Sequence, residues 1–363
     1  MVTLAPVADR RGRRAFFAVA EQVYRGNPCH RSTEDDIVRM LAFGRSAFHA
    51  HAEVRPYLVM DGGRVAGRLV LIHDRKAPGH VQVAFFEALP GLDGVQEAIR
   101  DEARRAFPGV PGVVAGLWGH VNYGAGFLAS CFDQPPVFGL PYTPAYYLDF
   151  FAGMKPHGMV SYRFDNQPFY DFAHAFGATF DPGPVRVRRL DRANLRRDTA
   201  IYTDLNNRCF GDHPFWADRT VDEDYELFHP FRWLIRDENL LFAEVDGEPV
   251  GFLLWYPDFN ELKPNGGALG VADVLRYRWA NPIRTVRLTE IGVLPGHRRG
   301  NPTAALILAM IRAVERGPYR FCEGGFIFES NRGSLGMTLK LLAQAFGREL
   351  EVHRRFAIFE GDL

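Results

Sequence analysis

Two segments of the chain share one pattern of apolar and polar positions. Residues 55–74 (RPYLVMDGGRVAGRLVLIHD) and 240–258 (LLFAEVDGEPVGFLLWYPD) each contain an apolar run, an Asp-Gly pair and a second apolar run. Asp-Gly between two such runs is a strong hairpin signal, because the tight turn needs positive φ angles that these residues adopt readily. The pattern therefore predicts two similar β-hairpins, one in each half of the chain.

The segments around both hairpins also correspond. Each hairpin follows a strand and a helical stretch and precedes a strand, a helix, a further strand and a further helix. In the first half that last helix is expected over residues 123–132 (YGAGFLASCF), and turn-forming residues cluster at 181–184 (DPGP). We expect an α/β (α+β) protein with two tandem domains, residues 1–180 and 181–363. Each would be a mixed, mostly antiparallel sheet flanked by helices.

The most informative stretch is residues 285–310, TVRLTEIGVLPGHRRGNPTAALILAM, whose pattern predicts a strand, a turn and a helix. Pro295 and Gly296 end the strand, and Pro302 suits the first turn of a helix. Such a turn directs backbone N–H groups and the positive helix end to one point, which is an anion site suited to a pyrophosphate. Only Gly300 stands where a glycine-rich phosphate loop would carry several glycines.

Composition and charge narrow the class of protein. Of 363 residues, 47% are hydrophobic and 24% are charged, and 43 basic side chains balance 43 acidic ones. These values are typical of a soluble globular protein and argue against a general binder of nucleic acid or anionic membranes. The four cysteines are widely separated and the N-terminus is charged. We therefore expect a cytoplasmic protein with no transmembrane segment, disulfide framework or metal site.

The order of elements, with TEIGVLPGHRRG at the fourth strand of the second domain, resembles the GNAT acyltransferase superfamily. The family signature there is V-x-P-x-x-R-G-x-G-x-G/A, and Val293, Pro295 and Arg298 match it without a gap. Arg299, Gly300, Asn301 and Thr303 then occupy the Gly, x, Gly and Gly/Ala positions of the signature, so Gly300 is displaced by one position.

A second signature of that family corresponds to ESNRGSLGMTLKLLAQAFG, with Asn331 at its Asn position and Thr338 where many members carry tyrosine. Across essentially the whole chain, stretches such as NPCHRSTEDDI, AGLWGHVNYGAGFL and LPYTPAYYLDFF resemble a bacterial tandem-GNAT group. Bacterial ceramide synthases, which N-acylate a sphingoid amine, are related to this group.

The resemblance implies an acyl-CoA site in the second domain. In such folds the fourth and fifth strands splay apart and the pantetheine arm pairs with the open edge of the fourth strand. Carried over, the backbone of Val293 and Leu294 would meet pantetheine, and Asn331 would lie near it. The residues expected around the phosphates are Arg298, Arg299, Gly300, Asn301 and Thr303. The matching turn of the first domain is acidic and lacks arginine, so that domain would be a structural partner without a phosphate site.

N-acylation from a thioester needs a group that deprotonates the amine. Glu290 lies where several GNAT enzymes carry a glutamate and is our candidate for the general base; alternatively, it forms an ion pair with Arg287. Because Thr338 replaces the usual tyrosine acid, a hydroxyl of Tyr142, Tyr146 or Tyr147 could substitute for it, or these rings could simply pack a core.

The acceptor site is expected near the segment between the first two helices of the second domain. His213 and Trp216 lie in that segment and are candidate substrate-binding residues together with Tyr147. The long connection after Tyr256 contains LGVADVLRYRWA, a further helix candidate, and connections of this length often cover a site.

Three functions are compatible with this pattern. The first is transfer of an acyl group from acyl-CoA to a small-molecule or lipid-like amine. In the second, an acyl-carrier protein is the donor. The third is a non-catalytic binding protein that has kept the fold.

Overall fold

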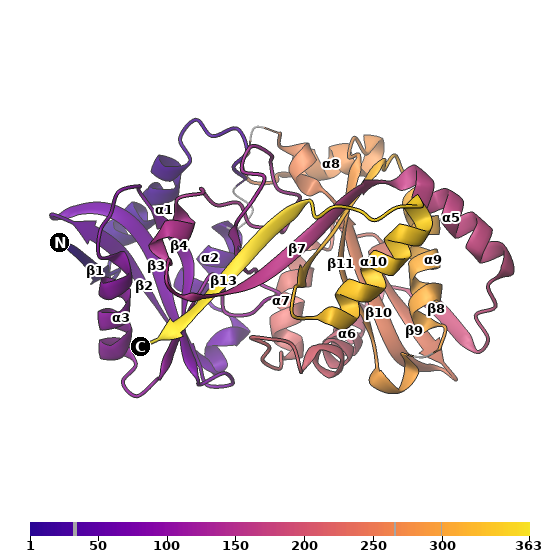
Figure 1. Cartoon of the computed structure of the whole chain (residues 1–363), viewed down its shortest axis with the longest axis horizontal. Helices are drawn as coiled ribbons and strands as arrows, with labels where there is room; N and C mark the ends of the chain where they lie inside the picture. The colour runs from indigo at the N-terminus through magenta and orange to yellow at the C-terminus, as the bar shows by residue number, and fades with distance from the viewer. Residues whose placement is uncertain (32–34, 265, 299) are drawn as a thin grey trace. The chain divides into compact units, whose positions relative to one another are not determined.

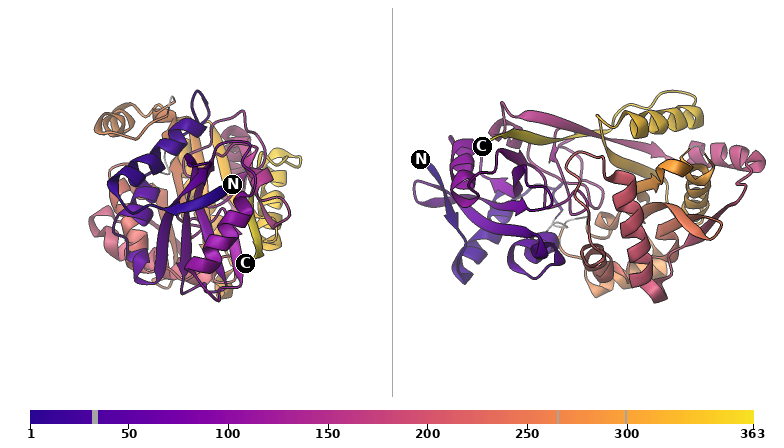
Figure 2. Two further views of the ribbon diagram at one scale, coloured as in Figure 1. Left: turned by 90° about the vertical axis from the view of Figure 1, so that its left-hand side faces the viewer. Right: turned by 90° about the horizontal axis from the view of Figure 1, so that it is seen from below.

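The computed structural model describes residues 1–31, 35–264, 266–298 and 300–363 (Figure 1). Contacts along the chain divide it into two compact units. The first contains Met1–Met159 with Arg354–Leu363, and the second contains Val160–His353. Each unit has its own run of strands and its own helices (Figure 2), and each has its own core.

The first unit is built on a mixed sheet in the order β1-β2-β3-β4-β5-β13. All neighbours run antiparallel except β4 and β5, which are parallel. The strands are β1 (Val2–Pro6), β2 (Ala52–Asp61), β3 (Arg64–Asp74), β4 (His80–Ala88), β5 (Gly112–Ala115), β6 (Phe127–Leu128), which pairs with β13, and β13 (Arg354–Asp362). The helices are α1 (Arg10–Val23), α2 (Asp35–Phe43), η1 (Ala47–Ala50), α3 (Val95–Ala106) and α4 (Tyr147–Phe150).

The second unit repeats this plan in the order β7-β12-β11-β10-β9-β8, with β11 and β12 as its parallel pair. The strands are β7 (Lys155–Asp165), whose residues up to Met159 group with the first unit, β8 (Val185–Arg189), β9 (Leu240–Val245), β10 (Glu248–Pro257), β11 (Thr285–Val293) and β12 (Phe321–Phe328). The helices are α5 (Asn166–Thr179), η2 (Arg192–Asn194), α6 (Leu195–Phe210), α7 (Val221–Phe231), η3 (Asp237–Asn239), η4 (Phe259–Leu262), α8 (Val271–Ala280), η5 (Pro295–His297), α9 (Pro302–Glu315) and α10 (Arg332–Phe346). The expected α/β fold is confirmed, and the strands of both units have the expected mixed, mostly antiparallel pairing.

Both predicted hairpins form, and their turns explain the Asp-Gly signal. β2 and β3 are joined through Gly62 and Gly63, which have φ angles of 54° and 80°. β9 and β10 are joined through Asp246 and Gly247, with φ angles of 54° and 87°. A two-residue turn with positive φ at both positions matches the twist of the flanking strands.

The expected helix over residues 123–132 is wrong. Gly124 and Gly126 have φ angles of 140° and 94°, which interrupt helical geometry, and β6 pairs with the C-terminal strand β13. The apolar residues at positions 123–128 are buried, and Phe127 and Leu128 join the sheet. The positive φ angles that glycine allows, and the pairing with β13 more than two hundred residues away, therefore outweigh the local helical pattern.

The units also divide the chain at different places from the predicted ranges 1–180 and 181–363. α5 groups with the second unit because it packs against α9 and α10. The last ten residues group with the first unit because β13 pairs with β5, from Phe359 opposite Ala115 to Asp362 opposite Gly112. The end of the chain is thus part of the first core.

We expect Ile358→Ala to destabilise the first unit by about 3 kcal/mol, because the side chain of Ile358 on β13 is completely buried and its loss leaves a cavity. Urea unfolding monitored by near-UV circular dichroism measures the change. Arg355→Ala, at an exposed position of the same strand, is the matched control and should change stability by less than about 0.5 kcal/mol. Equal effects of the two substitutions would show that β13 is not part of a core.

Candidate acyl-transfer site

The open edge of β11 is the central feature of the second unit. The parallel ladder with β12 covers only Thr285–Leu288 opposite Phe321–Gly324, whereas β11 continues to Val293. β12 leaves at Gly325, whose φ angle is 137° and where a Cβ atom would approach Ser161 and Val160 atoms at 3.0 Å. Five residues of β11, Thr289–Val293, therefore extend beyond the parallel ladder on the side of β12. This is the splay that the sequence resemblance implies.

A β-bulge turns the side chains of β11 at the start of this edge. Leu254 of β10 lies opposite Glu290, but the next residue, Trp255, lies opposite Leu288, so Thr289 is the extra residue. A bulge shifts the alternation of side chains between the two faces of a sheet. Here it directs Glu290 toward α6.

Glu290 is partly buried and held by two side chains of α6. Its Oε2 atom accepts hydrogen bonds from the Tyr202 hydroxyl (2.8 Å) and the Asn206 amide (2.6 Å). Tyr202 and Asn206 are four residues apart and so share one face of the helix. Burial raises the pKa of Glu290 above its usual value, although these two hydrogen bonds act in the opposite direction. The carboxyl group is thus fixed in place and made more basic.

The alternative interpretation paired Glu290 with Arg287. In the structure Arg287 is directed elsewhere, with its guanidinium donating to the Gly325 carbonyl (3.2 Å) and the Tyr256 hydroxyl (3.2 Å). Its positive charge still lowers the pKa of Glu290, but less than burial raises it. Glu290 therefore makes its hydrogen bonds with α6.

The turn after β11 carries a cation, Arg298, four residues before α9 begins. Arg298 donates to the Val293 carbonyl (3.1 Å) and the Cys209 carbonyl (3.3 Å), so it links the turn to the end of α6. α9 then begins at Pro302, as expected, with Gly300 just before the helix and Thr303 in its first turn. The Asn301 amide donates to the Asp181 carbonyl (2.6 Å). Arg299 lies outside the described residues.

His213 and Asn331, which lie far apart in the sequence, meet in the structure. The Asn331 Oδ1 atom accepts from the backbone N–H of Ser334, which caps α10 and leaves the amide group to face His213 Nε2 at 2.9 Å. Nε2 is therefore the acceptor, and His213 is neutral. Burial and the charge of Arg298 lower the pKa of His213, in agreement with that state. With its Nε2 lone pair engaged, His213 is better suited to positioning than to taking a proton.

Phe210 joins these residues to Trp216. Its ring lies 4.8 Å from that of His213 and 5.6 Å from that of Trp216. The second unit thus brings His213, Trp216 and Asn331 into one region beside the end of α6.

The predicted tyrosines lie in the first unit. Tyr147 is completely buried, donates to Glu87 (2.6 Å) and accepts from the Ala88 N–H (2.9 Å). Tyr142 and Tyr146 donate to the backbone carbonyls of Phe132 and Ala88. Tyr147 as a substrate-binding residue remains a prediction.

Sequence reasoning overlooked Glu87, whose signal is a lone carboxylate in the apolar run VAFFEAL. Burial raises the pKa of Glu87 to about 7, against the effects of Arg68, Tyr147 and Tyr24.

The first unit has a similar splay, but its environment differs. The ladder of β4 with β5 ends at Val83 opposite Ala115, while β4 continues to Ala88. There Phe85, at the position equivalent to Glu290, stacks on Trp118 with ring centres 5.4 Å apart. The hollow at the start of α3 is lined by Asp93, Glu97 and Asp149, with Arg100 as its one basic residue. Three carboxylates beside a single arginine disfavour the binding of a phosphate in this hollow.

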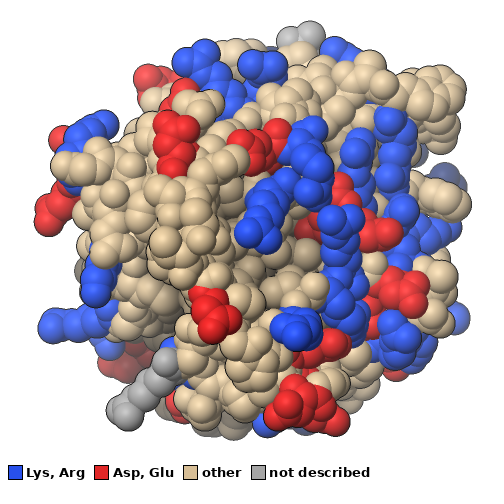
Figure 3. Space-filling view, turned by 90° about the vertical axis from the view of Figure 1, so that its right-hand side faces the viewer, with Lys and Arg blue, Asp and Glu red and all other residues tan. Residues whose placement is uncertain are grey.

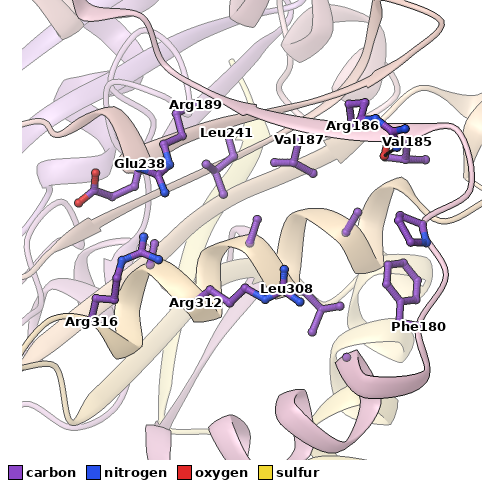
Figure 4. A pocket seen from close by; sticks show the side chains of 15 residues that line it. Phe180, Val185, Arg186, Val187, Arg189, Glu238, Leu241, Leu308, Arg312 and Arg316 are labelled. Carbon is purple, nitrogen blue, oxygen red and sulfur yellow. Dashed lines mark hydrogen bonds between the residues drawn. The ribbon is translucent and has the colours of Figure 1, made fainter.

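The second unit has a hollow of its own, of about 410 Å³, which lies between β8 and α9. Figure 4 shows Arg186 and Arg189 on the strand side and Arg312 and Arg316 on the helix side, with Leu308 beside Arg312 on the helix. Figure 3 shows basic side chains gathered in a band on one face of the molecule. The hollow shares no lining residue with the surroundings of Glu290 and is a separate feature.

The described residues contain no group of three or more His, Cys, Asp or Glu side chains that could hold a metal ion. Among their helices, none combines the length and apolar character needed to cross a bilayer.

Comparison with known proteins supports the tandem architecture. No family model matches the chain. A bacterial ceramide synthase from Caulobacter vibrioides is 25% identical over 267 residues, which is 68% of each chain. Protein YghO from Escherichia coli is 24% identical over 245 residues, covering 63% of this chain and 62% of that protein.

Solved structures extend the similarity to the whole chain. A tandem GNAT protein from the clavulanic acid biosynthesis pathway matches 100% of this chain and 98% of its own, with a TM-score of 0.56 and 15% identity. A GCN5-related N-acetyltransferase from Sphaerobacter thermophilus matches 99% of this chain and 95% of its own, with a TM-score of 0.50 and 15% identity. These likenesses, together with the two splayed sheets, show that the chain has the tandem GNAT fold.

Proposed function

We propose that the second unit is an N-acyltransferase domain that moves an acyl group from acyl-CoA to an amine. The observation that carries this proposal is the open edge of β11, with Glu290 at its beginning and the Arg298 turn at its end. A strand edge supplies hydrogen bonds to an extended amide-containing chain, and a helix start with a cation favours phosphate. In coenzyme A an amide-containing pantetheine arm leads to a pyrophosphate, which is the same order as the strand edge and the turn that follows it.

Each part of the donor has a proposed set of contacts. The pantetheine amides pair with the backbone of Val293 and Leu294, and Asn331 lies beside them. The pyrophosphate is held by the turn and the start of α9. The residues proposed there are Arg298, Arg299, Gly300, Asn301 and Thr303.

The reaction follows from the position of Glu290. The amine nitrogen attacks the thioester carbonyl carbon, Glu290 accepts a proton from that nitrogen, and the C–S bond breaks to release the thiolate and the amide. The raised pKa of Glu290 makes it a stronger base than an exposed carboxylate. The first unit, whose splay holds Phe85 and Trp118, serves as a structural partner.

For the acceptor, we propose a long-chain amine. The name of the ceramide synthase relative points to a sphingoid-type acceptor, and aromatic side chains are abundant around His213 and Trp216. An acyl-carrier protein as the donor would change only the group beyond the pantetheine arm.

The proposal is tested by incubating the full chain with acyl-CoAs of several lengths and with long-chain amines, including sphinganine. Free thiol release and mass spectrometry of the amide measure turnover, and calorimetry measures CoA binding. We expect binding near micromolar affinity and amide formation. Turnover with an acylated carrier protein but not with acyl-CoA would reassign the donor. No binding of CoA or any acyl-CoA and no turnover with either donor would leave a non-catalytic protein.

Glu290→Gln should lower kcat/KM by roughly a hundredfold or more, because the amide cannot accept the proton from the amine. Its oxygen can still accept from Tyr202 and Asn206, so CoA affinity in calorimetry should stay unchanged. Full activity of this variant across the pH range would remove Glu290 as the base.

Tyr202→Phe should shift the pH profile of kcat/KM to higher pH. The Tyr202 hydroxyl donates to Glu290 and thereby lowers the pKa of the carboxyl, so removal of that hydrogen bond raises the pKa further. The carboxylate needed for activity then forms at higher pH. An activity loss without any displacement of the acid limb would indicate only a packing role for Tyr202.

Arg298→Ala should weaken CoA binding by about tenfold, because a charge-assisted contact to phosphate and the link between turn and α6 are both lost. Calorimetry measures the change. Arg348→Ala, at an exposed arginine of the same unit, is the control and should leave affinity unchanged. If both variants bind CoA like the unmodified protein, the phosphates lie elsewhere.

A further inference from the structure

An apolar ridge on α8 faces solvent. Val271, Leu275 and Trp279 expose 77%, 42% and 83% of their surface, respectively. Their four-residue spacing places them along one face of the helix. Large apolar side chains this exposed are rare in the protein, and three of them occur on one short helix.

A second exposed tryptophan lies in a segment that is bound to α8. Trp233, which is 62% exposed, lies in the segment after α7. The Arg278 side chain of α8 donates to the carbonyls of Trp233 (2.8 Å) and Ile235 (3.1 Å), which fastens that segment to the helix. We name the four exposed side chains, Val271, Leu275, Trp279 and Trp233, the α8 ridge.

The ridge is held outward by a well-packed inner side of α8. Tyr277 is completely buried and its ring meets that of Phe259 edge-on, with centres 5.4 Å apart. Asp273 accepts from the Gly270 N–H (2.8 Å) and pairs with Lys263 (3.0 Å). The helix is therefore anchored in one orientation, and the exposure of its other face is a property of the fold.

Positive charge accompanies the ridge. Arg276 is exposed on α8, and the Arg232 guanidinium lies 5.1 Å from the centre of the Trp233 ring. Burial lowers the pKa of Arg278, and the nearby charges of Arg192 and Arg236 lower it further. Of the nearby acidic groups, Asp237 pairs with Arg192, and Asp273 is engaged at the start of α8. Basic side chains therefore outnumber acidic ones near the α8 ridge, although the net charge of the whole chain is zero.

The size of the ridge favours a lipid surface over a second copy of the chain. Given typical side-chain areas, its exposed surface is roughly 500 Å². A standard protein interface buries about 800 Å² on each partner. Tryptophan beside arginine is characteristic of segments that lie in the bilayer interface, where the rings enter the headgroup region and the charges meet anionic lipid.

We propose that the α8 ridge docks the protein on the surface of an anionic phospholipid bilayer. Val271, Leu275 and the two tryptophans enter the interface, while Arg232 and Arg276 face the lipid phosphates. This surface is distinct from the Glu290 region, and the proposal does not depend on acyltransferase chemistry. It would bring the second unit to the phase in which a long-chain amine resides.

Sedimentation with vesicles tests the proposal on the full chain. We expect binding to vesicles containing phosphatidylglycerol, weaker binding to pure phosphatidylcholine, and a decrease as salt is raised. Leu275→Gln with Trp279→Gln should reduce partitioning by roughly tenfold or more, since two apolar side chains no longer enter the interface. Arg276→Gln should reduce it by several-fold on anionic vesicles and leave binding to phosphatidylcholine unchanged.

Phe176→Gln on α5 is the matched control, because Phe176 is also an exposed apolar residue of the second unit, and it should bind vesicles like the unmodified protein. Thermal melting checks that each variant is folded. Absence of vesicle binding by the unmodified protein, or equal binding by the ridge variant, would overturn the proposal. A dimer in analytical ultracentrifugation that the ridge substitutions convert to monomer would assign the ridge to a second copy instead.

Discussion

The departure of β12 from β11 is the constraint on which the rest of the site depends. A strand in the middle of a sheet normally has its backbone groups satisfied on both sides. Here the parallel ladder stops at Leu288, and Gly325 allows β12 to turn away where any larger residue would meet Val160 and Ser161. Five residues of β11 extend past the ladder as a consequence. The bulge at Thr289 then turns Glu290 toward α6, and Arg298 braces the turn at the other end.

The two units show how one architecture diverges at such an edge. Both sheets splay after four residues of parallel pairing. In the second unit the edge carries a carboxylate and leads to an arginine. In the first unit Phe85 and Trp118 stack at the equivalent place, and the carboxylate of the strand, Glu87, is buried among Tyr24, Tyr147 and Arg68. The same fold therefore supports a candidate site in one half and a packed partner in the other.

Local signals in the sequence predicted the elements that depend on neighbouring residues. The Asp-Gly hairpins, the strand–turn–helix around Pro295 and the helix in the long connection all form as expected. Features that depend on distant residues could not be predicted in this way. The segment at residues 123–132 joins β13 instead of forming a helix, and the contacts of Glu290 with α6 and of His213 with Asn331 arise only when remote segments meet.

A crystal structure of the full chain with coenzyme A tests the central claim most directly. The account predicts that the pantetheine amides hydrogen-bond to the backbone of β11 beyond Leu288 and that the pyrophosphate lies at the start of α9, near Arg298. Density for coenzyme A along β4 of the first unit, or at another surface with the β11 edge empty, would contradict it.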